Sequence, residues 1–276
     1  MRTPIFLISL LYLGLSLTLN VQADVTMTLT APDGKAVGGD YSGQGIATWS
    51  NGDRYEGELK AGKRHGKGIY TWADSKDQYA GEYLNGERQG QGKYTWTNGN
   101  RYEGRWEKGE RTGKGIFAWS NGNRYEGSFV ADNRTGKGKL AWNNGDVYTG
   151  DFKDDERTGK GVYIWKNGDR YEGGYLNGRR HGTGSYTWKE TGNKYVGDWE
   201  TNQRTGQGIY SWKTGERYEG AFKDDQRHGL GTMFSAYGDR YEGGFENDKR
   251  HGDGKMIWAN GAMYEVKFEH GQQVKR

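Results

Sequence analysis

The sequence predicts an all-β protein whose single elongated, twisted antiparallel sheet is a meander of about ten 23-residue β-hairpin repeats. Three observations lead to this fold class. Equivalent tyrosines recur every 23 or 24 residues, apolar and polar residues alternate between them, and residues that favour tight turns separate the alternating segments. A helical array is excluded because each unit holds at least four glycines, and each glycine costs about 1 kcal/mol relative to alanine in a helix interior.

Residues 1–23 do not belong to the repeat. Met1 and Arg2 precede a mostly apolar run from Ile5 to Leu19, and Ala23 follows at a candidate cleavage site. The run has 15 residues, fewer than the roughly 20 that a spanning helix needs. We therefore expect a cleaved signal peptide, and an exported protein that is periplasmic or secreted, or peripheral on a membrane. An uncleaved anchor is the weaker alternative.

The composition limits the possible functions. The chain has 40 Lys and Arg, 36 Asp and Glu, and no cysteine. Disulfides and thiol catalysis are therefore excluded, and the nearly balanced charge argues against a nucleic-acid partner. The 20 Tyr, 11 Trp and 8 Phe argue against disorder, because disordered chains are poor in aromatic residues.

Each repeat is defined by an anchor tyrosine. The fourth residue after the anchor is bulky and apolar, the ninth is arginine in every complete repeat, and a Gly-x-Gly and a tryptophan follow. One complete repeat has Ser235 in place of this tryptophan. The anchors are Tyr55, Tyr79, Tyr102, Tyr125, Tyr148, Tyr171, Tyr195, Tyr218, Tyr241 and Tyr264.

The strands and turns follow from the order of these residues. Strand parity places the anchor, the bulky residue and the Gly-x-Gly glycines on one face, where glycine leaves room for neighbouring rings. The seventh residue after each anchor accepts positive φ, and Asn-Gly marks most of the other links. Across the Asn-Gly link, a two-residue loop would pair Trp49 with Arg54, and a three-residue loop would pair Trp49 with Tyr55.

The units "YEGELKAGKRHGKGIYTWADSKDQ" and "YEGGYLNGRRHGTGSYTWKETGNK" resemble MORN (membrane occupation and recognition nexus) repeats. The resemblance covers about residues 41–271, with threonine in place of histidine in several "RTG" segments and Val266 in place of a glycine. It implies an elongated scaffold with roles in membrane attachment, in phosphoinositide-associated proteins and in homodimerisation. With residues 1–23, it suggests a bacterial-type exported member of the family.

The same spacing predicts the domain layout. Residues 24–40 do not follow the repeat and form an N-terminal cap, residues 41–271 form the repeat array, and residues 272–276 form a tail. We expect no separate catalytic domain and no cofactor.

The side chains that could take part in catalysis or metal binding have structural interpretations. His65, His181, His228 and His251 share one repeat position and His270 has another, so we predict surface turn roles and no metal site. The recurring glutamates have matching environments, whereas acid–base catalysis needs two different ones. Each Gly-x-Gly precedes a strand, unlike a phosphate-binding loop, which precedes a helix. We therefore predict no catalytic residues and a protein that is not an enzyme.

Two rows remain as candidate binding residues. The aromatic row would hold sugars or choline-like groups by stacking and cation–π contact, or would pack against glycine. The arginine row would bind lipid phosphates or acidic glycans, or would pair with glutamate and turn carbonyls. The aromatic candidates are Tyr102, Trp119, Tyr125, Trp142, Tyr148, Trp165, Tyr171 and Trp188. The anionic-ligand candidates are Arg111, Arg134, Arg157 and Arg180.

The carboxy-terminal edge is the candidate for self-association. "YEVKF" ends the array, and its residues Tyr264, Val266 and Phe268 would form the edge of a homodimer. The leading functional hypothesis is thus a non-enzymatic scaffold for protein or membrane-associated interactions outside the cytoplasm. The alternative is a ligand-binding module for phospholipid headgroups or cell-envelope glycans.

Overall fold

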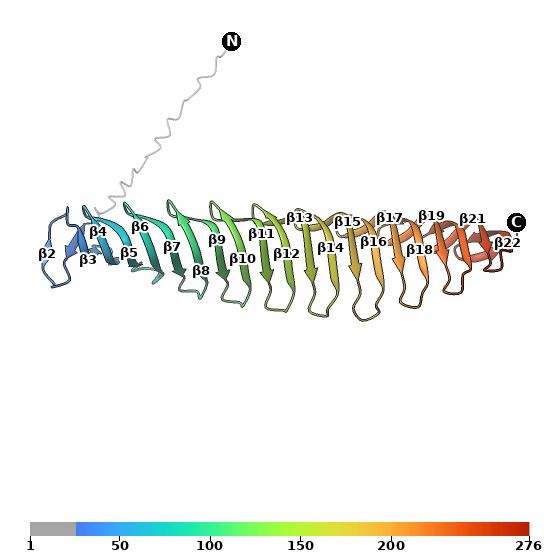
Figure 1. Cartoon of the computed structure of the whole chain (residues 1–276), viewed down its shortest axis with the longest axis horizontal. Coiled ribbons are helices and arrows are strands. Elements are labelled where there is room, and N and C mark those ends of the chain that lie inside the picture. The colour runs from blue at the N-terminus through green and yellow to red at the C-terminus, as the bar shows by residue number, and fades with distance from the viewer. Residues whose placement is uncertain (1–25, 276) are drawn as a thin grey trace, which may run out of the picture.

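A computed structural model describes residues 26–275, which form one 23-stranded antiparallel sheet (Figure 1). From β3 onward each strand pairs with its neighbours in sequence, so the sheet is an open, elongated and twisted meander. Within residues 26–275 there is no helix. The predicted fold class is confirmed. The predicted signal peptide, residues 1–23, lies outside the described residues.

The strands of the first half are β1 (Met27–Thr30), β2 (Ala36–Val37), β3 (Gly43–Trp49), β4 (Arg54–Lys60), β5 (Lys63–Thr71), β6 (Gln78–Leu84), β7 (Glu87–Thr95), β8 (Arg101–Glu107), β9 (Glu110–Ala118), β10 (Arg124–Val130) and β11 (Asn133–Ala141). Those of the second half are β12 (Val147–Lys153), β13 (Glu156–Ile164), β14 (Arg170–Leu176), β15 (Arg179–Thr187), β16 (Lys194–Glu200), β17 (Gln203–Ser211), β18 (Arg217–Lys223), β19 (Gln226–Phe234), β20 (Arg240–Glu246), β21 (Lys249–Ile257), β22 (Met263–Glu269) and β23 (Gln272–Val274).

Two kinds of turn alternate along the sheet. The turn within each repeat has two residues with positive φ, such as Ala61 (46°) and Gly62 (70°) between β4 and β5. Positive φ at both positions defines a type I′ turn, whose twist matches that of the flanking strands. The residues predicted to accept positive φ therefore do so, as the second residue of this turn.

The strand register across the turn between repeats differs from both registers expected from the sequence. The backbone N–H of Trp49 donates to the carbonyl of Asp53 (3.0 Å), and Thr48 lies opposite Arg54. The loop closes because the N–H of Gly52 donates to the carbonyl of Trp49 (2.8 Å) and the Asn51 side chain accepts from the N–H of Asp53 (3.0 Å). Trp49 thus faces Asp53, and neither Arg54 nor Tyr55.

A β-bulge in each repeat places the arginine opposite the bulky apolar residue of the preceding strand. In β4 and β5, Gly57 lies opposite Gly68, but the next pair is Leu59 with Arg64. Glu58 alone therefore opposes three residues of β5, including Gly66, whose φ is 52°. The ladder bends at this point, and the guanidinium lies above the rings of its own and neighbouring repeats, 4.7 Å from the Tyr70 ring centre.

The core is a layer of rings on one face of the sheet. The anchor tyrosines from Tyr55 to Tyr241 are at most 1% exposed. From Tyr79 onward each meets the bulky rings of its own and the next repeat edge to face, as Tyr125 meets Phe129 (5.2 Å, 90°) and Phe152 (5.1 Å, 80°). These perpendicular ring pairs are favourable beyond the area that they bury. The predicted aromatic layer is therefore confirmed.

An unbroken row of paired glycines makes this packing possible. Gly127 lies opposite Gly115 on one side and Gly138 on the other, and the pattern continues from Gly45 to Gly254. A Cβ at Gly127 would lie 2.3 Å from the Tyr125 hydroxyl, so the ring needs this space. Val266 ends the row, and its neighbour Tyr264 is 59% exposed.

Short strands lie at both ends of the array. At the amino-terminal end β1 pairs with β2 and with β3, so part of the predicted cap lies along the first array strand. At the other end β23 pairs with β22, so the predicted tail contains a strand.

Candidate functional site

The tyrosines predicted to bind ligands are not accessible. Tyr102, Tyr125, Tyr148 and Tyr171 are 0% exposed, and each hydroxyl donates to the backbone carbonyl three residues later, as from Tyr125 to Ser128 (3.1 Å). Burial raises the pKa of Tyr125 to about 12, because the charged form would lose its hydration. These four rings hold the sheet together and offer no face to a stacking ligand.

The predicted tryptophans are half-buried at the rim of the aromatic layer. Trp119, Trp142, Trp165 and Trp188 pack against the core and alternate with rings of adjacent repeats. Trp165, for example, lies 4.5 Å from Tyr163 and 5.0 Å from Tyr186, measured between ring centres. Each tryptophan is partly exposed, so a ligand role for the tryptophans stays a prediction.

The predicted anion-binding arginines already use their donors within the protein. The Nε of Arg134 pairs with Asp155 Oδ1 (2.7 Å), and its NH2 group donates to the Asp155 carbonyl (2.8 Å). Arg111 binds Asp132 in the same way, while Arg157 and Arg180 donate to the carbonyls of Gly178 and Asn202. The bonds to turn carbonyls agree with the structural interpretation of this row.

The charge partner of the arginine row differs from the expected glutamate. Arg134 pairs with an aspartate at the type I′ turn of the next repeat. The recurring glutamates instead pair with the arginine two residues earlier in their own strand, as Glu126 does with Arg124 (2.8 Å). The arginine row has the strand parity of the Gly-x-Gly glycines and so lies on the aromatic face, while the glutamates lie on the other face.

A groove runs along the face opposite the aromatic layer. It extends across β7 to β16, and its volume is about 1400 Å³. Its floor is the backbone of the glycine row, including Gly115, Gly127, Gly138 and Gly150. A side chain at these glycines would point into the aromatic layer, so the groove runs along their backbone between the flanking side chains of the opposite face and crosses ten strands.

The two walls of the groove carry different side chains. On the wall nearer the turns between repeats lie glutamates such as Glu103, apolar β-branched residues such as Ile116 and Val162, and one lysine, Lys139. On the wall nearer the type I′ turns lie Lys114, Lys137 and Lys160, one from each of three consecutive repeats. Lys137 pairs with Asp151 (2.7 Å). The groove is therefore a periodic surface in which one wall is basic.

The family model for the MORN repeat matches ten segments of the chain between residues 37 and 263. The chain belongs to the MORN repeat family. The matched segments are 37–54, 55–76, 79–101, 102–124, 125–147, 148–170, 171–190, 195–217, 218–240 and 241–263. The resemblance stated from the sequence is thus confirmed at family level.

Among solved structures, the MORN repeat protein is similar to the TCP10 domain of Danio rerio CPAP in complex with a STIL peptide, with a TM-score of 0.42, 10% identity, and coverage of 88% of this chain and 100% of that chain. It is also similar to the SAS-4 TCP domain of Drosophila melanogaster in complex with a proline-rich motif of Ana2, with a TM-score of 0.38, 12% identity, and coverage of 56% and 84%. These scores carry no functional conclusion. No curated protein sequence matches the chain.

The carboxy-terminal edge of the MORN repeat array is partly covered. β23 pairs with Lys267, Phe268 and Glu269 of β22, and both Val266 and Phe268 are buried. The predicted dimer edge is therefore shorter than the sequence suggested, and only Tyr264 of its three named residues is exposed.

No helix within residues 26–275 has the length and apolar character needed to cross a membrane.

Proposed function

We propose that this MORN repeat protein is a non-enzymatic scaffold that binds a segment of a partner protein along the glycine-floored groove. The shape and the repeated lining of the groove support this proposal. It is long, it follows the axis of the rod in Figure 1, and it presents the same few side-chain types repeat after repeat. A surface of this kind suits a linear partner that makes many similar contacts.

The spacing of the repeats fits an extended polypeptide. Each repeat contributes two strands, so equivalent wall residues recur about every 9.6 Å along the groove. An extended chain in the polyproline II conformation advances about 3.1 Å per residue with three residues per turn, and every third residue of such a segment would therefore meet an equivalent position. Acidic residues of the partner would face Lys114 and Lys160, while its apolar residues would contact Ile116 and Val162.

The chemistry of the groove favours binding over catalysis. Acid–base catalysis needs titratable groups in contrasting environments, whereas Glu103, Glu126 and Glu172 occupy equivalent positions on one wall. The groove therefore lacks the differentiated pair that a hydrolytic site would need.

Site-specific photo-crosslinking tests the proposal. A photoreactive phenylalanine analogue at Val162 in the groove should cross-link a protein partner in cells that produce the chain. The control is Tyr237, whose side chain is 88% exposed in a turn between repeats and does not line the groove. Cross-links from Tyr237 alone, or equal cross-links from both positions, would contradict groove binding.

A charge variant addresses the role of the basic wall. Lys114→Glu with Lys160→Glu should weaken capture of the cross-linked partner, because both side chains point away from the aromatic core and lie on the groove wall. The control, Lys63→Glu, alters a charge at the type I′ turn of the first repeat and should leave capture unchanged. The ligand-binding alternative predicts that the protein is retained on phospholipid vesicles or envelope glycans. Trp142→Ala would then abolish this retention, and the groove variant would keep it.

We also propose that the protein acts outside the cytoplasm, on the strength of the apolar run from Ile5 to Leu19 and of Ala23. N-terminal sequencing of the protein from the exported fraction should begin at Asp24. A membrane-bound product that retains Met1 would instead indicate an uncleaved anchor.

A further inference from the structure

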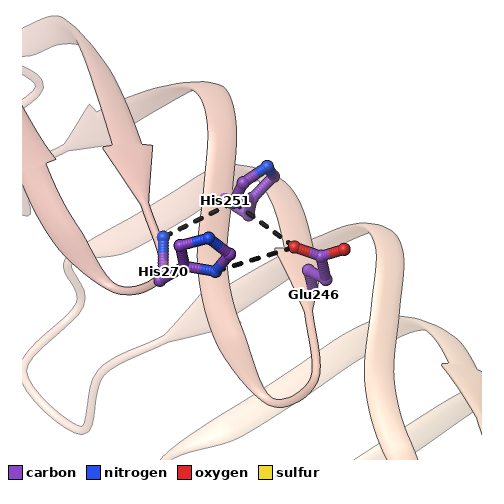
Figure 2. A group of neighbouring side chains, drawn as sticks. All are labelled: Glu246, His251 and His270. Atoms are coloured by element: carbon purple, nitrogen blue, oxygen red, sulfur yellow. Dashed lines mark hydrogen bonds and ion pairs between the residues drawn. The ribbon is translucent and has the colours of Figure 1, made fainter.

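Three potential metal ligands converge at the carboxy-terminal end of the array (Figure 2). They are Glu246 at the end of β20, His251 on β21, and His270 in the turn between β22 and β23. One ligand atom from each lies within 4.8 Å of the other two. The Nδ1 atoms of His251 and His270 are 3.6 Å and 3.8 Å from Glu246 Oε2.

The repeat pattern shows how unusual this group is. Each complete repeat has positions equivalent to those of Glu246, His251 and His270. They are the fifth and tenth residues after the anchor and the sixth residue after the next anchor. Elsewhere they hold sets such as Lys223, His228 and Asn247, or Leu176, His181 and Thr201. Only around His251 are all three positions filled by residues that ligate transition metals.

The geometry suits a tetrahedral ion. Zn²⁺ binds histidine nitrogen and carboxylate oxygen at about 2.0–2.2 Å, which puts ligand atoms at the corners of a tetrahedron roughly 3.4 Å apart. The two distances to Glu246 Oε2 are close to this value. Coordination by His251 Nδ1 would replace only a long hydrogen bond, 3.4 Å from the backbone N–H of His270.

We propose that Glu246, His251 and His270 form a binding site for a divalent transition-metal ion, for which Zn²⁺ is the best match. Two imidazoles and one carboxylate are a donor set that favours zinc over magnesium or calcium, which prefer oxygen ligands. Three protein ligands leave one tetrahedral position for water or another ligand. The site is on the surface, because His270 is 75% exposed, so an ion can enter from solvent.

This proposal differs from the sequence-based prediction that the chain has no metal site. The prediction compared histidines at the same repeat position in adjacent repeats. The structure brings together different positions, because Gly252 of β21 lies opposite Phe268 of β22 and the following turn places His270 beside His251. Their ring centres are 5.1 Å apart although 19 residues separate them in sequence.

The first experiment measures Zn²⁺ binding by calorimetry with protein that carries no affinity tag. We expect one saturable site, no comparable binding of Mg²⁺, and NMR shifts of the His251 and His270 rings but not of His228. Histidine assignment is tractable because the chain has only 5 histidines. The absence of saturable binding would overturn the proposal.

Substitutions found in other repeats remove single ligands with little effect on folding. His270→Asn introduces the residue found at the equivalent turn position, where Asn247 has nearly the same φ (49° against 48°). It should weaken Zn²⁺ binding by at least about tenfold, because even outer-shell partners of metal ligands contribute that much. The matched control, His228→Thr, should leave binding unchanged. Equal affinity in His270→Asn and the parent would disprove the site.

A variant that gains a second metal site tests the proposal without removing any ligand from the first site. The repeat around His181 matches the one around His251 closely, since both have glycine at the third position after the anchor, Gly174 and Gly244. Leu176→Glu with Thr201→His would recreate the three-ligand arrangement there. We expect the stoichiometry to rise from one ion to two. A stoichiometry that stays at one in a folded variant would show that this geometry does not bind zinc.

Discussion

The hydroxyl of Tyr125 donates a hydrogen bond to the backbone carbonyl of Ser128, at 3.1 Å, where the β-bulge shifts the register of β10 and β11. A bulge interrupts the ladder and leaves backbone groups in need of partners. The anchor therefore has two functions, because its ring fills the space above the glycines and its hydroxyl satisfies a carbonyl. Tyrosine serves both, and phenylalanine would serve only the first.

Tyr125→Phe should lower the free energy of unfolding by about 1–3 kcal/mol, the cost of leaving a buried carbonyl unsatisfied. Denaturant unfolding of the variant and the parent measures this difference. The matched control is Tyr237→Phe, because Tyr237 is 88% exposed, and we expect no change there. Equal stability of Tyr125→Phe and the parent would mean that water replaces the hydroxyl.

A second prediction concerns stability in acid. Asp146 accepts hydrogen bonds from the Tyr163 hydroxyl (2.7 Å) and from the backbone N–H of Lys166 in the next inter-repeat turn (2.8 Å). Partial burial alone would raise the pKa of Asp146, but these bonds and one from Asn144 outweigh it and hold the pKa below its ordinary value. The stabilisation is therefore present above about pH 3.9, the unfolded value, and is lost as the pH falls through the folded pKa.

Asp146→Asn should keep the contacts and remove this pH dependence. Asparagine occurs naturally at the equivalent position, where Asn193 accepts from the N–H of Lys213 and donates to the Tyr210 hydroxyl, both at 3.1 Å. Thermal melts should show a smaller loss between pH 7 and pH 3 in the variant than in the parent. The same loss in both would mean that other carboxylates dominate acid unfolding.

A third prediction concerns the repeat that lacks tryptophan. Ser235 Oγ accepts from the N–H groups of Tyr237 (3.2 Å) and Asp239 (3.1 Å), a role that Asn51 has for Asp53 in the first repeat. Ser235→Trp alone should therefore destabilise the fold by about 1 kcal/mol, because one or both bonds are lost. Adding Tyr237→Asn restores the turn acceptor and should recover the loss, as melting temperatures would show. A single variant that is fully tolerated would contradict this role of Ser235.

Self-association through β22 stays a prediction, but the strand edge available for it is shorter than expected from the sequence. β23 covers Lys267, Phe268 and Glu269, and exposed strand edges tend to pair. Deleting residues 272–276 should therefore increase self-association, which sedimentation at micromolar concentration would detect as a larger dimer fraction. If the β23 deletion has no effect on mass, the dimer does not form through this edge.

The repeat could be predicted from the sequence because every position is sampled about ten times. Tyr125, Gly127 and Phe129 keep their spacing and lie on the predicted face. The inter-repeat register could not be predicted, because it depends on the hydrogen bond from Gly52 to Trp49 rather than on parity.

The charge partners of the arginine row and the binding surfaces could not be predicted without the three-dimensional structure. The pairing of Arg134 with Asp155 depends on the register between β11 and β12, which an alternation of faces does not specify. The lysine wall of the groove had a signal, since Lys114, Lys137 and Lys160 recur at the twelfth position after their anchors. That signal was ambiguous because exposed lysines are common on any sheet.

The meander also determines how the protein would respond to tension. Its first and last strands lie at opposite ends of the rod (Figure 1), so a pull on the two ends acts across the strands. A load in that direction separates neighbouring strands one hydrogen bond at a time, because it does not shear a whole ladder at once. Since each repeat contacts only its neighbours, the end repeats would peel away first while the remainder stays folded. A protein of this shape, tethered at both ends, would lengthen in steps of one hairpin and shorten again when the force is released.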